Sequence, residues 1–60
     1  MARTTVVEVV IGKHQRYEVV CVSDWLETFY YVRGDRGYRA GSFASRRAAY
    51  EHACRKAEVF

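Results

Sequence analysis

The sequence predicts an α+β fold, in which an antiparallel β-meander of three to four strands is followed by one C-terminal α-helix packed on one face of the sheet. Three observations lead to this prediction. Residues 4–33 are rich in β-branched and aromatic side chains, short polar turns separate them into runs, and alanines recur every fourth residue near the C-terminal end. Sixty residues allow one small domain, residues 1–60, with a thin core.

The strands are expected in order along the chain. Residues 4–11 form a dense β-branched run, and residues 16–23 resume the pattern after a short turn, so these two runs are predicted to pair as a hairpin. After a loop or bulge at residues 24–26, a third strand is expected at 27–33 and a fourth at 38–42. The turn between them contains glycine and aspartate, which suit a second hairpin.

The helix is expected directly after the last strand, with Phe43 as the hinge. Ser45 is the predicted N-cap, since its hydroxyl can accept a hydrogen bond from a backbone N–H of the first turn. Ala49, Ala53 and Ala57 then fall on one helix face. A face of methyl groups can approach the sheet closely, so the large core side chains must come from the strands.

Side-chain alternation predicts a sheet with two apolar faces. In the first strand, Val7, Val9 and Ile11 are expected on one face, and Val6, Glu8 and Val10 on the other. In the strand at 16–23, Val20 and Val22 are expected on one face, and Tyr17, Val19 and Cys21 on the other. In the strand at 27–33, Tyr30 and Val32 are expected on one face, and Phe29 and Tyr31 on the other. One helix covers one face, so the other face is predicted to bind a second copy in a two-fold homodimer, or another protein.

The net charge of +3 is unevenly distributed. Residues 1–32 carry three basic and four acidic side chains, whereas residues 33–60 carry seven basic and three acidic ones. Most of the basic residues are arginine, which suits planar recognition of phosphate. A continuous nucleic-acid-binding stripe is therefore predicted, formed by Arg33, Arg36, Arg39, Arg46 and Arg47 with Tyr31 and Tyr38.

Arg46 and Arg47 fall in the first helical turn, where cations oppose the helix dipole. Two interpretations remain open. Both guanidinium groups can converge with the free backbone N–H groups on an anion such as phosphate, or both can point into solvent.

Several classes of protein are not indicated. No apolar run approaches the roughly 18 residues of a membrane span and no signal segment is present, so no membrane association and a cytoplasmic location are expected. Cys21 and Cys54 are expected as buried free thiols, and His14 and His52 as exposed side chains without metal-ligand spacing. No nucleophile has an evident base, so we expect no enzymatic activity, no cofactor and no metal.

The last third of the chain carries a family resemblance. The pattern Gly41-x-Phe43-x-Ser45, followed by Ala49 and Ala53, resembles the strand-to-helix joint of the plant ethylene-response-factor DNA-binding domain and of the arm-binding domain of phage-type integrases. The resemblance implies three antiparallel strands, one helix and DNA contact through the sheet in the major groove. By position, the residues that it implicates are Arg33, Arg39, Tyr31 and Tyr38.

The end of the peptidoglycan-binding SPOR repeat reads similarly, but SPOR domains carry a further helix that residues 12–27 do not supply. The sequence therefore predicts a small, non-enzymatic nucleic-acid-binding module that uses its basic C-terminal half. The alternative is an adaptor or inhibitor of the phage or mobile-element type, which docks on another protein through the apolar sheet face.

Overall fold

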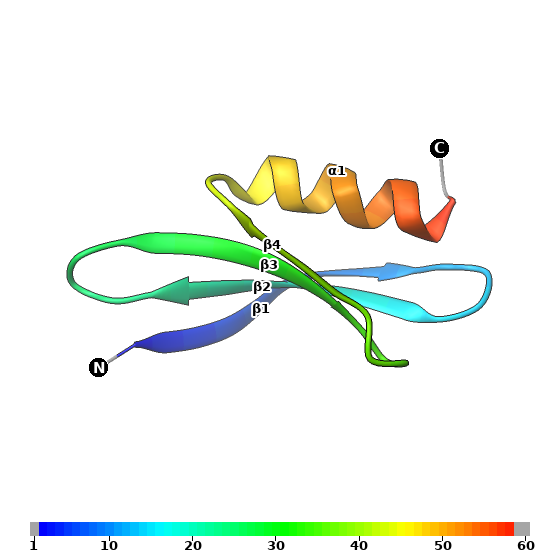
Figure 1. Ribbon diagram of the computed structural model, residues 1–60, viewed down its shortest axis with the longest axis horizontal. Helices are drawn as coiled ribbons and strands as arrows, with labels where there is room; N and C mark the ends of the chain where they lie inside the picture. Colours follow the sequence, from blue (N-terminus) through cyan, green and yellow to red (C-terminus); the bar gives the residue numbers. More distant parts are fainter. Residues whose placement is uncertain (1, 59–60) are drawn as a thin grey trace.

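The computed structural model describes residues 2–58, in which four strands and one helix follow one another in the predicted order (Figure 1). The elements are β1 (Arg3–Ile11), β2 (Arg16–Ser23), β3 (Thr28–Gly34), β4 (Arg39–Phe43) and α1 (Arg46–Ala57). The predicted α+β meander is confirmed, with four strands, although the pairing register shifts once between β1 and β2 and once between β3 and β4. Strand boundaries differ from the expected ones by one residue at most.

Each strand pairs antiparallel with the next, which gives the sheet order β1-β2-β3-β4. The sheet is visibly twisted, and α1 runs back along one side of it (Figure 1). We call this side the covered face, and the side turned away from α1 the open face. Both terminal hairpin turns, β1–β2 and β3–β4, lie at the end of the sheet where α1 finishes.

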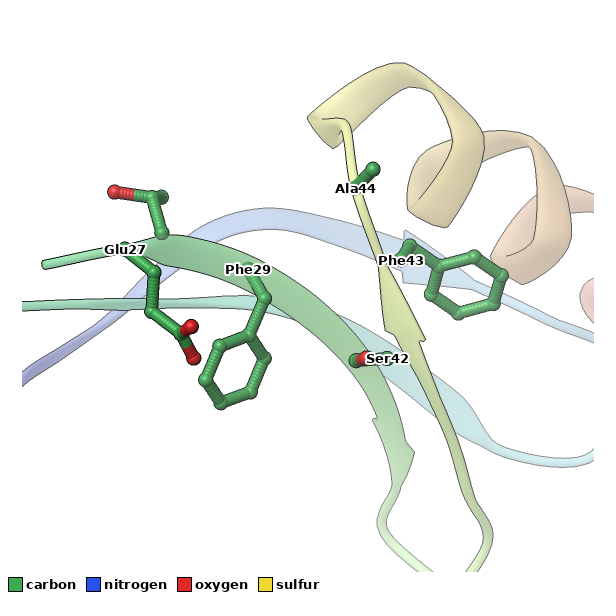
Figure 2. A pocket seen from close by; sticks show the side chains of 6 residues that line it. Glu27, Phe29, Ser42, Phe43 and Ala44 are labelled. Atoms are coloured by element: carbon green, nitrogen blue, oxygen red, sulfur yellow. The ribbon is translucent and has the colours of Figure 1, made fainter.

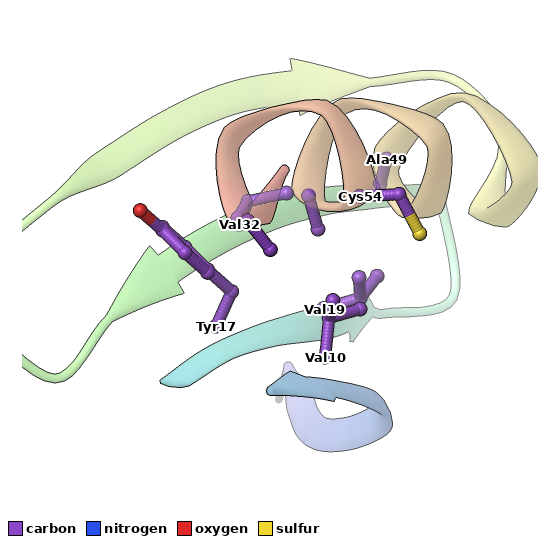
Figure 3. Close-up of a cluster of buried hydrophobic side chains, with 8 residues drawn as sticks. Val10, Tyr17, Val19, Val32, Ala49 and Cys54 are labelled. Carbon is purple, nitrogen blue, oxygen red and sulfur yellow. The ribbon is translucent and has the colours of Figure 1, made fainter. Parts of the chain in front are cut away.

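The core lies between the covered face and α1. The strands contribute the large side chains, among them Tyr17, Val19 and Val32, and the helix contributes Cys54 and small residues (Figure 3). The predicted alanine face is confirmed, because Ala49, Ala53 and Ala57 are all buried. A Cβ on Gly12 would lie 2.9 Å from the backbone carbonyl oxygen of Gln15, within the β1–β2 turn, and 3.1 Å from the Ala57 Cα at the helix end. Glycine is therefore required there by packing.

The start of α1 also follows the prediction. The Ser45 hydroxyl accepts a hydrogen bond from the backbone N–H of Ala48 at 3.1 Å, as an N-cap does. Phe43 is the last residue of β4, and its half-buried side chain packs against the core. Only Ala44 and Ser45 separate the strand from the helix, so the turn is tight.

The predicted alternation in β1 is wrong because the strand contains a β-bulge. Val6 pairs with Val20, whereas Glu8 pairs with Val19, which leaves Val7 as an extra residue. From Glu8 onward the alternation is therefore shifted by one residue. Val7 now packs against the core from the covered side, as does Val10, while Val9 joins Val6 on the open face.

The open face is partly closed by its own side chains. Val20 is fully buried at its centre, between its cross-strand neighbours Val6 and Tyr31. Exposure increases toward the β1 edge, where Val9 is 48% and Ile11 68% exposed. The expected apolar surface thus exists on β1, whereas Val20 on β2 is covered by its neighbours.

Candidate nucleic-acid interface

Basic residues from three separate segments lie at the end of the molecule where the β1–β2 and β3–β4 turns meet the C-terminus of α1, with Arg33 and Arg39 on the open face and Lys56 over the Tyr38 ring on the side of α1. Strand register places these turns side by side, because Tyr17 pairs with Gly34 and Ile11 pairs with Arg16. We call this region the basic end. Its residues are Lys13, Arg16, Arg33, Arg36, Arg39, Arg55 and Lys56.

Hydrogen bonds tie the two turns together. The backbone N–H of Asp35 donates to the carbonyl of Arg16 at 3.2 Å, and the backbone N–H of Arg36 donates to Gln15 Oε1 at 3.3 Å. The Gly34 N–H closes the β3–β4 turn by donating to the Tyr38 carbonyl at 2.8 Å. The basic end is therefore presented by ordered backbone and not by a loose loop.

Glu18 is placed between two of these arginines on the open face. Arg33 Nε donates to Glu18 Oε1 at 2.7 Å, and Arg16 Nη2 donates to Oε2 at 2.8 Å. These bonds, first from Arg33 and then from Arg16, hold the pKa of the Glu18 carboxyl below its usual range, and the same contact raises the pKa of Arg33. The three side chains border a shallow hollow of about 240 Å³ with Gly34 and Asp35.

Arg39 lies over the ring of Tyr31, with its guanidinium carbon 4.3 Å from the ring centroid. Gly41 leaves the room for this arrangement, since it is the cross-strand partner of Tyr31 and a Cβ there would lie 2.7 Å from the Tyr31 Cβ. The φ angle of Gly41, +148°, also favours glycine. The pair offers a planar cation and an aromatic ring on one surface.

Arg36 and Arg39 differ from Arg33 in their electrostatic surroundings. Within residues 2–58, the ion pairs of this region involve Glu18 with Arg16 and Arg33 alone. The side chains of Arg36 and Arg39 are exposed. They therefore carry charge that no carboxylate of the described chain offsets by direct contact.

The predicted stripe is not continuous, because Arg46 and Arg47 lie at the other end of α1. Arg46 donates to the Glu8 carboxylate and to the Val7 carbonyl, and Arg47 pairs with Glu51 at 3.2 Å. Twelve helical residues, about 18 Å at 1.5 Å each, lead from there to the basic end. Of the two interpretations drawn from the sequence, exposure to solvent describes Arg47, whose side chain is 87% exposed, whereas Arg46 is held by the sheet.

The two tyrosines of the predicted site lie on opposite faces of the sheet. Tyr31 is on the open face, whereas Tyr38 packs against the core, edge-on to Tyr17 at 5.8 Å between ring centroids. The Tyr38 hydroxyl forms a hydrogen bond of 2.6 Å with His52 Nε2. The expectation that His52 is exposed is therefore wrong, since its ring is half-buried beside Tyr38 and Phe43.

Four contributors to the basic end, Lys13, Arg16, Arg55 and Lys56, were not among the predicted site residues. Lys13 and Arg16 belong to the half of the sequence in which acidic residues outnumber basic ones, so a division by residue number conceals them. Meander topology was the available signal, because alternate turns of an antiparallel meander lie at the same end of the sheet. The two thiols are free as expected, although Cys21 is only half-buried.

A larger hollow, of about 610 Å³, lies at the opposite end of the sheet, where β4 leaves β3 (Figure 2). Its lining includes Phe29, Phe43 and Ser42, and Glu27 is its one titratable side chain. The hollow therefore combines one carboxylate with the hydroxyl groups of Thr28 and Ser42 and with apolar side chains.

Across residues 2–58, no group of three or more metal-ligating side chains is close enough to hold an ion, and no helix is long and apolar enough to cross a membrane. Fold and charge distribution define a small α+β meander protein with a basic end. The chain matches no protein-family model, no curated protein and no solved structure. The resemblance to βββα DNA-binding domains therefore stays a prediction.

Proposed function

We propose that the protein is a small, non-enzymatic nucleic-acid-binding module and that the basic end is its phosphate-binding surface. The observation that carries the proposal is that seven basic residues on three segments lie at one end of the molecule, with Glu18, Asp35 and Glu58 as the acidic residues of that end. Such a cluster is the electrostatic footprint expected for a polyanion.

The residues have different proposed roles. Arg36 and Arg39 contact phosphates directly, since no carboxylate of residues 2–58 holds them. Arg33 contributes less, because Glu18 shares its charge. Tyr31, together with the guanidinium of Arg39 above it, supplies a planar surface for a base. Arg46 and Arg47 have no role in this proposal because they lie at the other end of α1, and Tyr38 has none because its ring packs against Tyr17, His52 and Lys56.

The test is a salt titration of binding to duplex and single-stranded DNA. Release of counterions predicts that log affinity falls with log salt at a slope of about −0.9 per phosphate contact, so roughly −3 to −5 for three to five contacts. Arg36→Glu and Arg39→Glu are expected to weaken binding and flatten this slope. A slope near zero would overturn the proposal.

The matched control is Arg47→Glu, which changes the net charge by the same amount at an exposed helical position far from the basic end. If net charge alone attracted DNA, Arg47→Glu and Arg36→Glu would weaken binding equally. The proposal requires a larger loss for Arg36→Glu. Equal losses would show that no particular surface binds.

A second candidate function is docking on another protein through the open face. It is favoured by the apolar side chains around Val20, namely Val6, Val22, Phe29 and Tyr31. Binding of that kind would be weakened by Phe29→Ser and would be indifferent to Arg36→Glu. Either function suits the cytoplasm, where free thiols such as Cys21 and Cys54 stay reduced.

A further inference from the structure

Four side chains along β3 and the residue before it follow an order that matches its own reverse. From the β2–β3 turn to the basic end, they are Glu27, which precedes the strand, and then Phe29, Tyr31 and Arg33 on the open face of β3. Figure 2 shows Glu27 and Phe29 pointing to the same side, away from α1. The row thus begins with an acid, continues with two aromatic rings and ends with a base.

A two-fold axis that lies in the plane of the open face, perpendicular to β3 at Tyr30, would set this row against its own copy. It would place Glu27 opposite the second copy's Arg33 and Phe29 opposite the second copy's Tyr31. Each contact occurs twice, as in any isologous interface. We propose that the protein forms a two-fold dimer by packing two open faces in this antiparallel orientation.

Charge across the rest of the face favours the same axis. At the basic end, the open face carries Arg16, Arg33 and Arg39, with Glu18 and Asp35 beside them in the hollow, whereas the turn at the other end carries Asp24 and Glu27. The antiparallel orientation therefore brings a surplus of one positive charge onto two negative charges. The other two-fold axis, parallel to the strands, would bring the two basic ends together and is opposed by repulsion.

The exposed apolar residues are distributed to match. Trp25 and Leu26, 83% and 73% exposed, lie in the β2–β3 turn, and Ile11 lies at the opposite end of the sheet. The turn is held in shape by Asp24, whose Oδ1 accepts hydrogen bonds from the N–H groups of Leu26 at 2.8 Å and Glu27 at 2.9 Å. In the proposed dimer this ordered turn reaches the end of the second copy that carries Ile11.

The size of the face sets the expected affinity. Four strands about 4.8 Å apart and about 23 Å long give a footprint of roughly 440 Å² per copy, or roughly 900 Å² in total. This is below the range of stable interfaces and within that of weak, transient ones. Self-association in the absence of nucleic acid is therefore expected to be weak and to need high protein concentrations.

The decisive experiment exchanges the charges at Glu27 and Arg33 and measures mass by sedimentation equilibrium without nucleic acid. The Glu27→Arg chain and the Arg33→Glu chain each place like charges opposite one another twice, so each alone should self-associate at least about tenfold more weakly than wild type. An equimolar mixture of the two restores both attractive contacts. The mixture should form a heterodimer about as tight as the wild-type dimer.

The control is the same exchange at Arg47 and Glu51, which pair with each other on the exposed side of α1. Arg47→Glu and Glu51→Arg, alone or mixed, should leave the mass unchanged. Phe29→Ser, near the centre of the row, should abolish the dimer while circular dichroism shows an intact fold. The proposal would be overturned if the mixed chains associated no more tightly than each chain does alone. It would also be overturned if the wild-type protein stayed monomeric at millimolar concentration.

Discussion

The guanidinium of Arg46 holds the carboxylate of Glu8, with Nε and Nη2 donating to Oε2 at 3.1 and 2.9 Å. The same Nη2 donates to the Val7 carbonyl at 2.9 Å, so one side chain ties the first turn of α1 to the bulge of β1. A cation at a helix start opposes the dipole, and a carboxylate from the sheet offsets that cost here. Arg46 therefore has a structural role that its position in the sequence does not reveal.

Replacement of Arg46 by alanine is expected to lower the free energy of unfolding by about 1–2 kcal/mol, because it removes a partly exposed ion pair and a hydrogen bond to the backbone. Urea denaturation measures the loss. Arg47→Ala serves as the control and should cost under about 0.5 kcal/mol, since its pairing with Glu51 is an exposed helical contact. Equal costs for the two variants would contradict the assigned role.

Ser45→Ala is expected to lower the free energy of unfolding by about 1 kcal/mol, because the Ala48 N–H loses its acceptor. Ser45→Asp keeps an acceptor and adds a negative charge at the helix start, so its stability should stay close to that of wild type. Both values come from urea denaturation followed by circular dichroism. An aspartate variant as unstable as the alanine variant would argue against the cap.

Enlarging the alanine face should destabilise the protein. Ala53 is fully buried between α1 and the sheet, so Ala53→Leu is expected to cost about 1–3 kcal/mol through overpacking. Ala48→Leu is the matched control, since it makes the same change at an exposed position of the same helix. Thermal unfolding of both variants tests the difference. A leucine tolerated equally at both positions would mean that the helix does not lie close to the sheet.

The Glu18 cluster predicts a dependence of stability on pH. Its carboxyl has a lowered pKa in the folded protein, so Glu18 contributes stability above the unfolded value of about 4.3, and this contribution is lost as pH falls through the folded pKa. Wild type should therefore exceed Glu18→Gln in stability at pH 6, and the difference should shrink at pH 3. Urea denaturation at the two pH values measures it. A difference that does not change with pH would contradict the role given to Arg33 and Arg16.

Much of the fold could be predicted from local patterns. The β-branched runs and their turns located all four strands to within a residue, and Ser45 with its following alanines located the helix and the side it buries. These features depend on side chains a few residues apart, which is why the sequence displays them. The candidate site was predicted less well, since Arg33, Arg36 and Arg39 are neighbours in the hairpin but Arg46 and Arg47 are not part of that cluster.

The sequence by itself determined the order of the elements, the helix cap and the surplus of positive charge in residues 33–60. Only the tertiary structure decided which face α1 covers and where the bulge at Val7 shifts the alternation of side chains in β1. It also placed Lys13 and Arg16 at the same end of the molecule as the arginines of the last hairpin. It also decided that Arg46 meets Glu8, 38 residues earlier in the chain. Such contacts depend on how the helix returns across the sheet, and no local spacing of residues encodes that path.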